Sequence, residues 1–528
     1  MARENNRNPR RKERAQNPDE RRGVRAGTAG RADRAGTGKP RMSDEEREEL
    51  RAERRRQRER DMRRHLIISS VLVTLILAAA VTGIAIVSRN KKINNSAKAE
   101  KAAEIAAEEA EIAARRNSIA DAEKMAEGYD YDGAIAMLQA EKDYDTDGEL
   151  INAIARFTAE KSTLEAKDPL TVPHIFYQSL IVDPDRIFSP GHFSDAIVGA
   201  NNAFMATADE FDSVTQQMYD RGWVLVRMRD LVTETTDSDG TVHLKKNTSL
   251  MLPADKKPYV LSVDDLAYHH SLEGKGFADK LVVTGSGEVK AQYTDANGNV
   301  STGDYDVVPK LDAFIKAHPD AAYRGARGML ALSGYDGVFG YRTDTAYKTG
   351  KKLDKPQKKW LEAHPDFNWD KEVQDAKKVA DALRAGGWEF ACNTWGHVIV
   401  SDKTVDELKT DHEKWKNTVA PIAGETDTII FSNGGDVGTW RNYDENANPA
   451  YGYYKSEGYH FYGIVDNTSE SWIQIQDDYL RQGRIAVNGL QMWRVMSGTA
   501  KKNVFEQLFD IESVFDSRRP TPVSATGR

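Results

Sequence analysis

Short apolar runs alternate with amphipathic stretches over the C-terminal two thirds of the chain, from residue 174 to residue 487. Runs of four to eight apolar residues are typical of buried strands, and apolar positions that recur every three or four residues are typical of helices packed on one face. This alternation predicts an α/β domain with parallel strands, either a barrel or an open sheet. The predicted strands are 174–181, 223–228, 259–263, 329–332, 388–393, 428–431, 459–465 and 484–487, and the predicted helices are 208–221, 307–317, 372–385 and 405–418.

A different pattern lies near the N-terminus, where residues 66–87 form an uncharged, largely aliphatic stretch. At 1.5 Å per residue a helix of this length crosses a hydrocarbon layer of about 30 Å. A cleaved signal peptide is the alternative, but the basic region before the stretch is too long and no small-residue cleavage site follows it. We therefore predict a transmembrane helix over 66–87.

Charge is distributed unevenly around this stretch. Residues 1–65 contain 22 Lys and Arg against 13 Asp and Glu, which leaves 52 against 69 in the remainder and makes the two parts +9 and −17. Such a basic tail has too little apolar surface to fold and predicts a disordered cytoplasmic segment, with residues beyond the helix outside the cell. The basic flank of a membrane helix explains the arginines, so no nucleic-acid partner is expected. The single cysteine, Cys392, excludes an internal disulfide and fits a bacterial surface protein.

Residues 88–166 separate the predicted membrane helix from the α/β domain. Their first part is rich in Ala, Glu and Lys, as in a solvated helix, and the segment from Tyr129 to Leu138 is similar to the turn and second helix of a tetratricopeptide hairpin. One or two such units are too few for a solenoid, so we predict a helical stalk.

Polar residues follow three of the predicted strands. Asp264 and Asp265 end the first, Asn393 ends the second with His397 four residues on, and Asn433 opens a Gly-rich loop after the third. Adjacent carboxylates at the end of a buried strand need a cation or strong donors, although a helix cap or turn is an equal alternative. Because the carboxyl ends of parallel strands carry the reactive groups of both α/β architectures, we predict a site here.

These three blocks, in this order, resemble the polysaccharide deacetylase family, whose catalytic part is the NodB homology domain. The resemblance runs from about residue 172 to 520 and implies an irregular (β/α)7-type barrel. The resulting domain prediction is a disordered tail over 1–65, a transmembrane helix over 66–87, a helical stalk over 88–166, a deacetylase-like domain over 167–520 and a C-terminal tail over 521–528.

The resemblance also implies a chemistry. Asp264 would be the general base that takes a proton from water. Asp265 and His397 would hold a divalent metal, commonly zinc. Asn393 stands where the family places its first histidine ligand, and an amide oxygen is a weaker zinc ligand than imidazole. His269, His270 or His460 would then have to complete the metal site.

Two functions remain open at this stage. One is a membrane-anchored, metal-dependent deacetylase of an acetylated polysaccharide or peptidoglycan, and the other is a catalytically inactive glycan-binding envelope protein that keeps the fold. The candidate sugar contacts are Tyr268, Trp395, Asn433, Trp440 and Asp466. For each tyrosine and tryptophan, packing in the core is the alternative.

Overall fold

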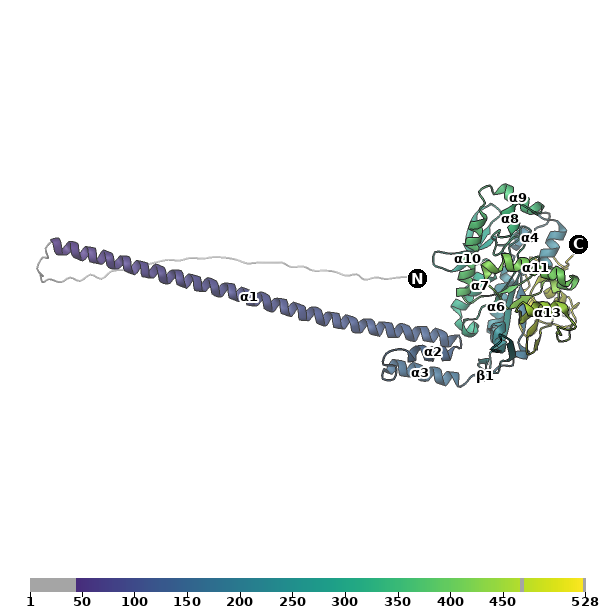
Figure 1. The fold of residues 1–528 in the computed structure, drawn as a ribbon, viewed down its shortest axis with the longest axis horizontal. Helices are drawn as coiled ribbons and strands as arrows, with labels where there is room; N and C mark the ends of the chain where they lie inside the picture. The colour runs from purple at the N-terminus through teal and green to yellow at the C-terminus, as the bar shows by residue number, and fades with distance from the viewer. Residues whose placement is uncertain (1–43, 466–469, 526–528) are drawn as a thin grey trace, which may run out of the picture. The chain divides into compact units, whose positions relative to one another are not determined.

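The structure is a computed structural model that describes residues 44–465 and 470–525 (Figure 1). It divides into two compact units, residues 1–106 and residues 107–528. Within the first unit the described chain is one helix, the N-terminal part of α1 (Asp44–Glu127). This helix contains a stretch that is long and apolar enough, by length and composition, to cross a membrane. Residues 1–43 of the predicted tail and the predicted contact residue Asp466 lie outside the described residues.

The second unit is built on seven parallel strands, which follow the order β11-β12-β13-β14-β16-β2-β7. Pairing of β11 with β7 closes the ring, so the predicted α/β barrel is confirmed. The strands are β2 (His174–Tyr177), β7 (Lys257–Asp264), β11 (Met329–Leu332), β12 (Glu389–Cys392), β13 (Thr428–Ile430), β14 (Phe461–Val465) and β16 (Leu480–Ala486).

The barrel is irregular at β7, its longest parallel strand. The first half of β7 pairs with β3 (Trp223–Leu225), and the second half pairs with β11. Strand 223–228 of the sequence prediction therefore lies beside the ring and is not one of its seven members. The remaining strands are β1 (Glu165–Ala166), β4 (Val232–Thr236), β5 (Val242–Lys246), β6 (Met251–Leu252), β8 (Lys280–Val283), β9 (Val289–Thr294), β10 (Val300–Gly303) and β15 (Trp472–Ile475).

Helices surround the ring, and the four predicted helices are observed within three residues of their expected ends. They are α6 (Ala208–Asp220), α7 (Val307–Ala317), α10 (Trp369–Ala385) and α11 (Val405–Thr418). The others beyond α1 are α2 (Tyr131–Gln139), α3 (Gly148–Lys161), α4 (Pro184–Phe188), α5 (Asp195–Phe204), α8 (Thr345–Thr349), α9 (Lys355–Ala363), α12 (Ala420–Ala423), α13 (Pro449–Ser456), α14 (Gly489–Met496) and α15 (Ile511–Val514).

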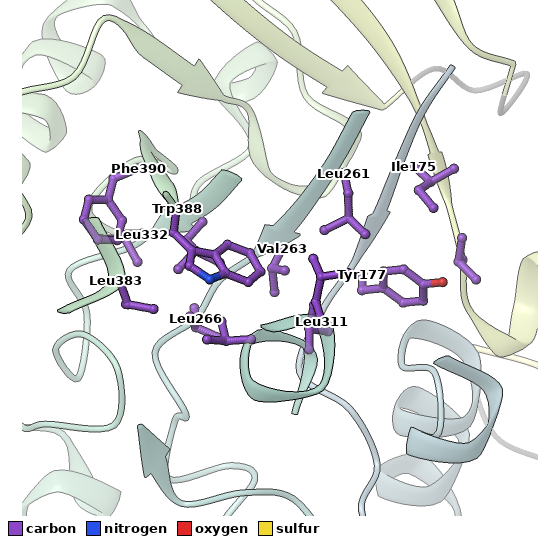
Figure 2. Close-up of a cluster of buried hydrophobic side chains, with 14 of the residues drawn as sticks. Ile175, Tyr177, Leu261, Val263, Leu266, Leu311, Leu332, Leu383, Trp388 and Phe390 are labelled. Carbon is purple, nitrogen blue, oxygen red and sulfur yellow. The ribbon is translucent and has the colours of Figure 1, made fainter. Parts of the chain in front are cut away.

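Alternate side chains of each barrel strand point to opposite sides, which produces two apolar layers. The outer layer joins strand residues such as Leu261 and Phe390 to the surrounding helices. Figure 2 shows part of this layer, in which Leu311 of α7 and Leu383 of α10 lie close to side chains of β2, β7 and β12. The inner layer includes Val260 and Ala331, and buried polar residues such as Asp264 and Asn393 lie near the carboxyl ends of the strands.

The helical hairpin predicted as part of the stalk belongs to the second unit. Its buried residues share one apolar cluster with the inner face of the barrel. Two hydrogen bonds add to this contact: Tyr129 Oη donates to the Asp320 carbonyl at 2.9 Å, and the Arg324 amide donates to the Gly128 carbonyl at 2.7 Å. The boundary that we predicted at residue 166 therefore lies within a compact unit.

Candidate functional site

A cavity of about 820 Å³ opens at the carboxyl ends of the barrel strands. Its volume lies within the range of small-molecule sites, about 300–1,000 Å³. The polar lining residues are Gln178, Asn201, Asp264, Asp265, Ser271, His397, Asn433, Asn488 and Arg494, and the apolar ones are Phe176, Ala196, Ile197, Ala200, Phe204, Met205, Leu272, Val465 and Ala486, with Gly434 between them. The structure thus brings together four of the predicted site residues, Asp264, Asp265, His397 and Asn433.

Backbone strain is concentrated around this end of the barrel. Residues other than glycine rarely adopt a positive φ, which costs about 1–3 kcal/mol, and such strain clusters at functional sites. Three cavity residues have it: Asp265 at 55°, His397 at 49° and Asn433 at 55°. Each follows a different strand, so the loops after β7, β12 and β13 each place a residue of left-handed backbone conformation at the cavity.

Asp264 forms a buried, bidentate ion pair with Arg484 of β16. Arg484 Nη1 donates to Oδ1 at 2.6 Å and Nη2 donates to Oδ2 at 2.9 Å, and the arginine side chain is completely buried. Arg484 also donates to Ser262 Oγ at 3.0 Å. Two parallel charge-assisted hydrogen bonds fix the orientation of the carboxyl group across the barrel.

Asp265 is paired with a different cation, the imidazole of His269. His269 Nε2 lies 2.9 Å from Oδ2 and 3.1 Å from Oδ1, and Ser333 Oγ donates to Oδ1 at 2.6 Å. On the other side of the ring, Nδ1 lies 3.4 Å from Oδ2 of the buried Asp336. The imidazole is therefore placed between two carboxylates.

This arrangement shifts the pKa of both partners. Burial alone would raise the pKa of Asp265, but the charges of His269 and His397 and the hydrogen bonds from His269 and Ser333 lower it well below its ordinary value. Burial alone would lower the pKa of His269, but the charge of Asp265, its hydrogen bonds and the nearby Asp336 raise it to about 10. At neutral pH the pair is an imidazolium and a carboxylate.

His397 and Asn433 contact each other at the cavity. Asn433 Nδ2 donates to the His397 carbonyl at 3.1 Å and lies 3.5 Å from its Nδ1. This contact ties the loop after β12 to the loop after β13. It fixes His397 where its charge acts on Asp265.

Asn393 does not line the cavity. It is completely buried, its Nδ2 donates to the Ile430 carbonyl at 2.8 Å, and its Oδ1 has no hydrogen-bond partner among the described residues. The amide therefore links β12 to β13 inside the barrel. One oxygen remains able to accept a hydrogen bond.

The metal that the family resemblance implies would need Asp265, His397 and Asn393 as ligands. Within residues 44–465 and 470–525, no group of three or more His, Cys, Asp and Glu side chains is arranged to hold a metal ion. Both oxygens of Asp265 already contact His269, and Asn393 does not line the cavity, although its Oδ1 has no partner among the described residues. As arranged here, the residues do not fit a zinc site, whose ligands converge on one point.

The other predicted contact residues lie away from the cavity. Tyr268 is buried and donates to Asp306 Oδ2 at 2.6 Å, so it serves the core. Trp395 is partly buried with Lys414 Nζ over its ring at 4.4 Å, and Trp440 is exposed in the loop after β13. Of the alternative histidines, His270 pairs with Glu273, and His460 bonds the Asp478 carbonyl; only His269 contacts Asp265.

Three residues of the site were not predicted from the sequence: Arg484, Ser333 and Arg494. Arg484 could have been recognised from the sequence, because it is a charged residue that begins the predicted strand 484–487. Ser333 and Arg494 could not, since a serine after β11 and an arginine on a short helix are ordinary in sequence. His269 was named only as one of three alternatives.

No protein-family model and no curated protein matches the chain. A solved structure that it is similar to is the Streptococcus pyogenes deacetylase PplD in complex with acetate, with 13% sequence identity, coverage of 63% of this chain and 98% of that chain, and a TM-score of 0.32. A likeness at this level carries no conclusion about the site. The barrel is established by its strand pairing, and membership of the polysaccharide deacetylase family stays a prediction.

Proposed function

We propose that the chain is a membrane-anchored saccharide-binding protein, whose barrel binds an acylated sugar in the cavity without a metal ion. The observation that carries this proposal is the Asp265–His269 pair, in which an imidazolium neutralises the carboxylate that a metal would need. Asp264 is neutralised by Arg484 in the same way. The side chains of Asp264 and Asp265 are therefore paired within the protein and line a binding site.

The lining of the cavity suits an acylated sugar. Gln178, Asn201, Asn433 and Asn488 contribute amide groups, which donate to and accept from hydroxyl groups. Gln178 makes no side-chain hydrogen bond to the described residues, so both of its polar atoms are available to a ligand. Ile197, Ala200 and Phe204 of α5 also line the cavity and present apolar surface suited to an acyl group and to the C–H faces of a sugar ring.

The anchor and the outward placement of the barrel follow from the sequence. The apolar stretch within α1 is long enough to span, and the arginine-rich flank before it favours a cytoplasmic N-terminus. An acylated saccharide at the cell surface, such as peptidoglycan, is then the accessible ligand.

Hydrolysis of the acyl group is the second candidate, and Asp264 favours it. Its carboxyl group lines the cavity at the position where the family resemblance would place a general base. This candidate needs either a metal that displaces His269 or an activated water held by the protein alone.

Calorimetric titration of the solubilised full-length chain with tri-N-acetylchitotriose tests the proposal. We expect binding that is unchanged by EDTA and at least about tenfold weaker in Ala200→Trp, because the indole fills the cavity beside α5. Ala363→Trp, an exposed position on α9, is the control and should bind as the wild type does.

Two results would count against this assignment. Titration without binding, or binding that Ala200→Trp leaves unchanged, contradicts a sugar site in the cavity. Acetate release in the same samples, abolished by Asp264→Asn, would establish the hydrolytic candidate instead.

A further inference from the structure

The charged side chains that line the cavity differ in whether they have a partner among the described residues. Asp264 forms an ion pair with Arg484, and both oxygens of Asp265 lie within hydrogen-bonding distance of His269. Arg494 also lines the cavity, and among the described residues its guanidinium has neither an ion pair nor a hydrogen bond. It is the only permanently charged lining side chain without a counter-charge in the described chain.

The fold holds Arg494 at the cavity through two neighbouring elements. It lies in the last turn of α14, which begins directly after β16, the strand that carries Arg484. Helix α14 packs against α5, the helix that forms the apolar wall. The guanidinium therefore belongs to the same rim as the apolar surface, and its distance from the strand ends is limited by one short helix.

We infer that the natural ligand carries an anionic group, a carboxylate or a phosphate, which Arg494 binds while the acylated sugar occupies the rest of the cavity. This inference deepens the proposed function and rests on it for the sugar, but not for the anion. A planar guanidinium presents parallel N–H donors that match the oxygens of either anion, which favours a two-pronged contact.

A matched set of probes tests the inference by titration of the solubilised full-length chain. N-acetylglucosamine is neutral, N-acetylmuramic acid adds a carboxylate to it, and N-acetylglucosamine 1-phosphate adds a phosphate; inorganic phosphate is the anion alone. We expect at least one anionic sugar to bind about tenfold tighter than N-acetylglucosamine, and the preferred one identifies the anion.

Charge-removing variants separate the anion site from general charge effects. Arg494→Gln should erase the preference for the anionic sugar, and Arg494→Lys should retain part of it, because the ammonium keeps the charge but not the paired donors. Lys377→Gln on α10 is the control: it removes an exposed positive charge that does not line the cavity and should leave the preference unchanged.

The outcomes distinguish this inference from the proposed function. Equal binding of neutral and anionic sugars, or a preference that survives Arg494→Gln, overturns the anion site while leaving the saccharide site intact. Arg494-dependent binding of inorganic phosphate without binding of any sugar supports the anion site and contradicts the proposed function. Absence of binding by all four probes overturns both.

Discussion

Replacing Arg484 with leucine is expected to lower the free energy of unfolding by about 3–5 kcal/mol, because it leaves the Asp264 carboxylate buried without a counter-charge. The loss includes hydrogen bonds to both carboxylate oxygens and to Ser262. Chemical denaturation of the full-length chain, followed by tryptophan fluorescence, measures the change.

Two control variants test whether the loss of stability comes from the unpaired buried charge. Arg116→Leu removes an exposed arginine 3.8 Å from Glu149 and should change the stability by less than about 1 kcal/mol. The double variant Asp264→Leu/Arg484→Leu should recover most of the loss, because an apolar pair replaces the ion pair without leaving a buried charge. A double variant as unstable as Arg484→Leu alone would show that packing of the arginine, and not its charge, stabilises this part of the barrel.

The second large effect concerns the pKa of His269, which we expect to lie near 10 in the folded chain. Asp265→Asn should lower it by roughly two units or more, toward the ordinary value of about 6.5, because the nearest negative charge is lost. Ser333→Ala removes a hydrogen bond to Asp265 but keeps the ion pair, and should leave the pKa of His269 raised above its ordinary value. Titration of the histidine ring carbons by NMR reports each value.

The pH dependence of stability follows from the same pair. Since folding raises the pKa of His269, its contribution is complete below about pH 6.5 and is lost as the pH rises through about 10. Since folding lowers the pKa of Asp265, its contribution is present above about pH 4 and is lost as the pH falls. The pair therefore stabilises the fold across the neutral range, and a stability that rose from pH 7 to pH 10 would contradict it.

The strands and helices of the barrel were predictable because short apolar runs alternate with amphipathic stretches along the chain. Helices 307–317 and 405–418 match α7 and α11 at both ends, where Asp306 and Thr404 cap the first turns. The small antiparallel pieces were not predicted, since β8, β9 and β10 are short strands whose polar faces resemble loops. Closure of the ring depends on β7 pairing with β11, a contact that no local pattern encodes.

The position of the site was predictable from the sequence, but the partners of its side chains were not. Asp264, Asp265, His397 and Asn433 meet at one cavity because the ends of parallel strands meet at one edge. The partner of Asp264 is distant in sequence: Arg484 lies on β16, which is separated from β7 by β2 in the ring. The direction of Asn393 depends on a single hydrogen bond to Ile430, which sequence spacing does not reveal.

The central claim is that His269, and not a metal ion, neutralises Asp265. Equilibrium titration of the metal-stripped full-length chain with zinc, followed by metal analysis of the dialysed protein, tests it most directly. We expect no stoichiometric zinc in the wild-type chain, and the same result for Asp265→Ala. One zinc ion bound tightly per chain, and lost in Asp265→Ala, would contradict the account.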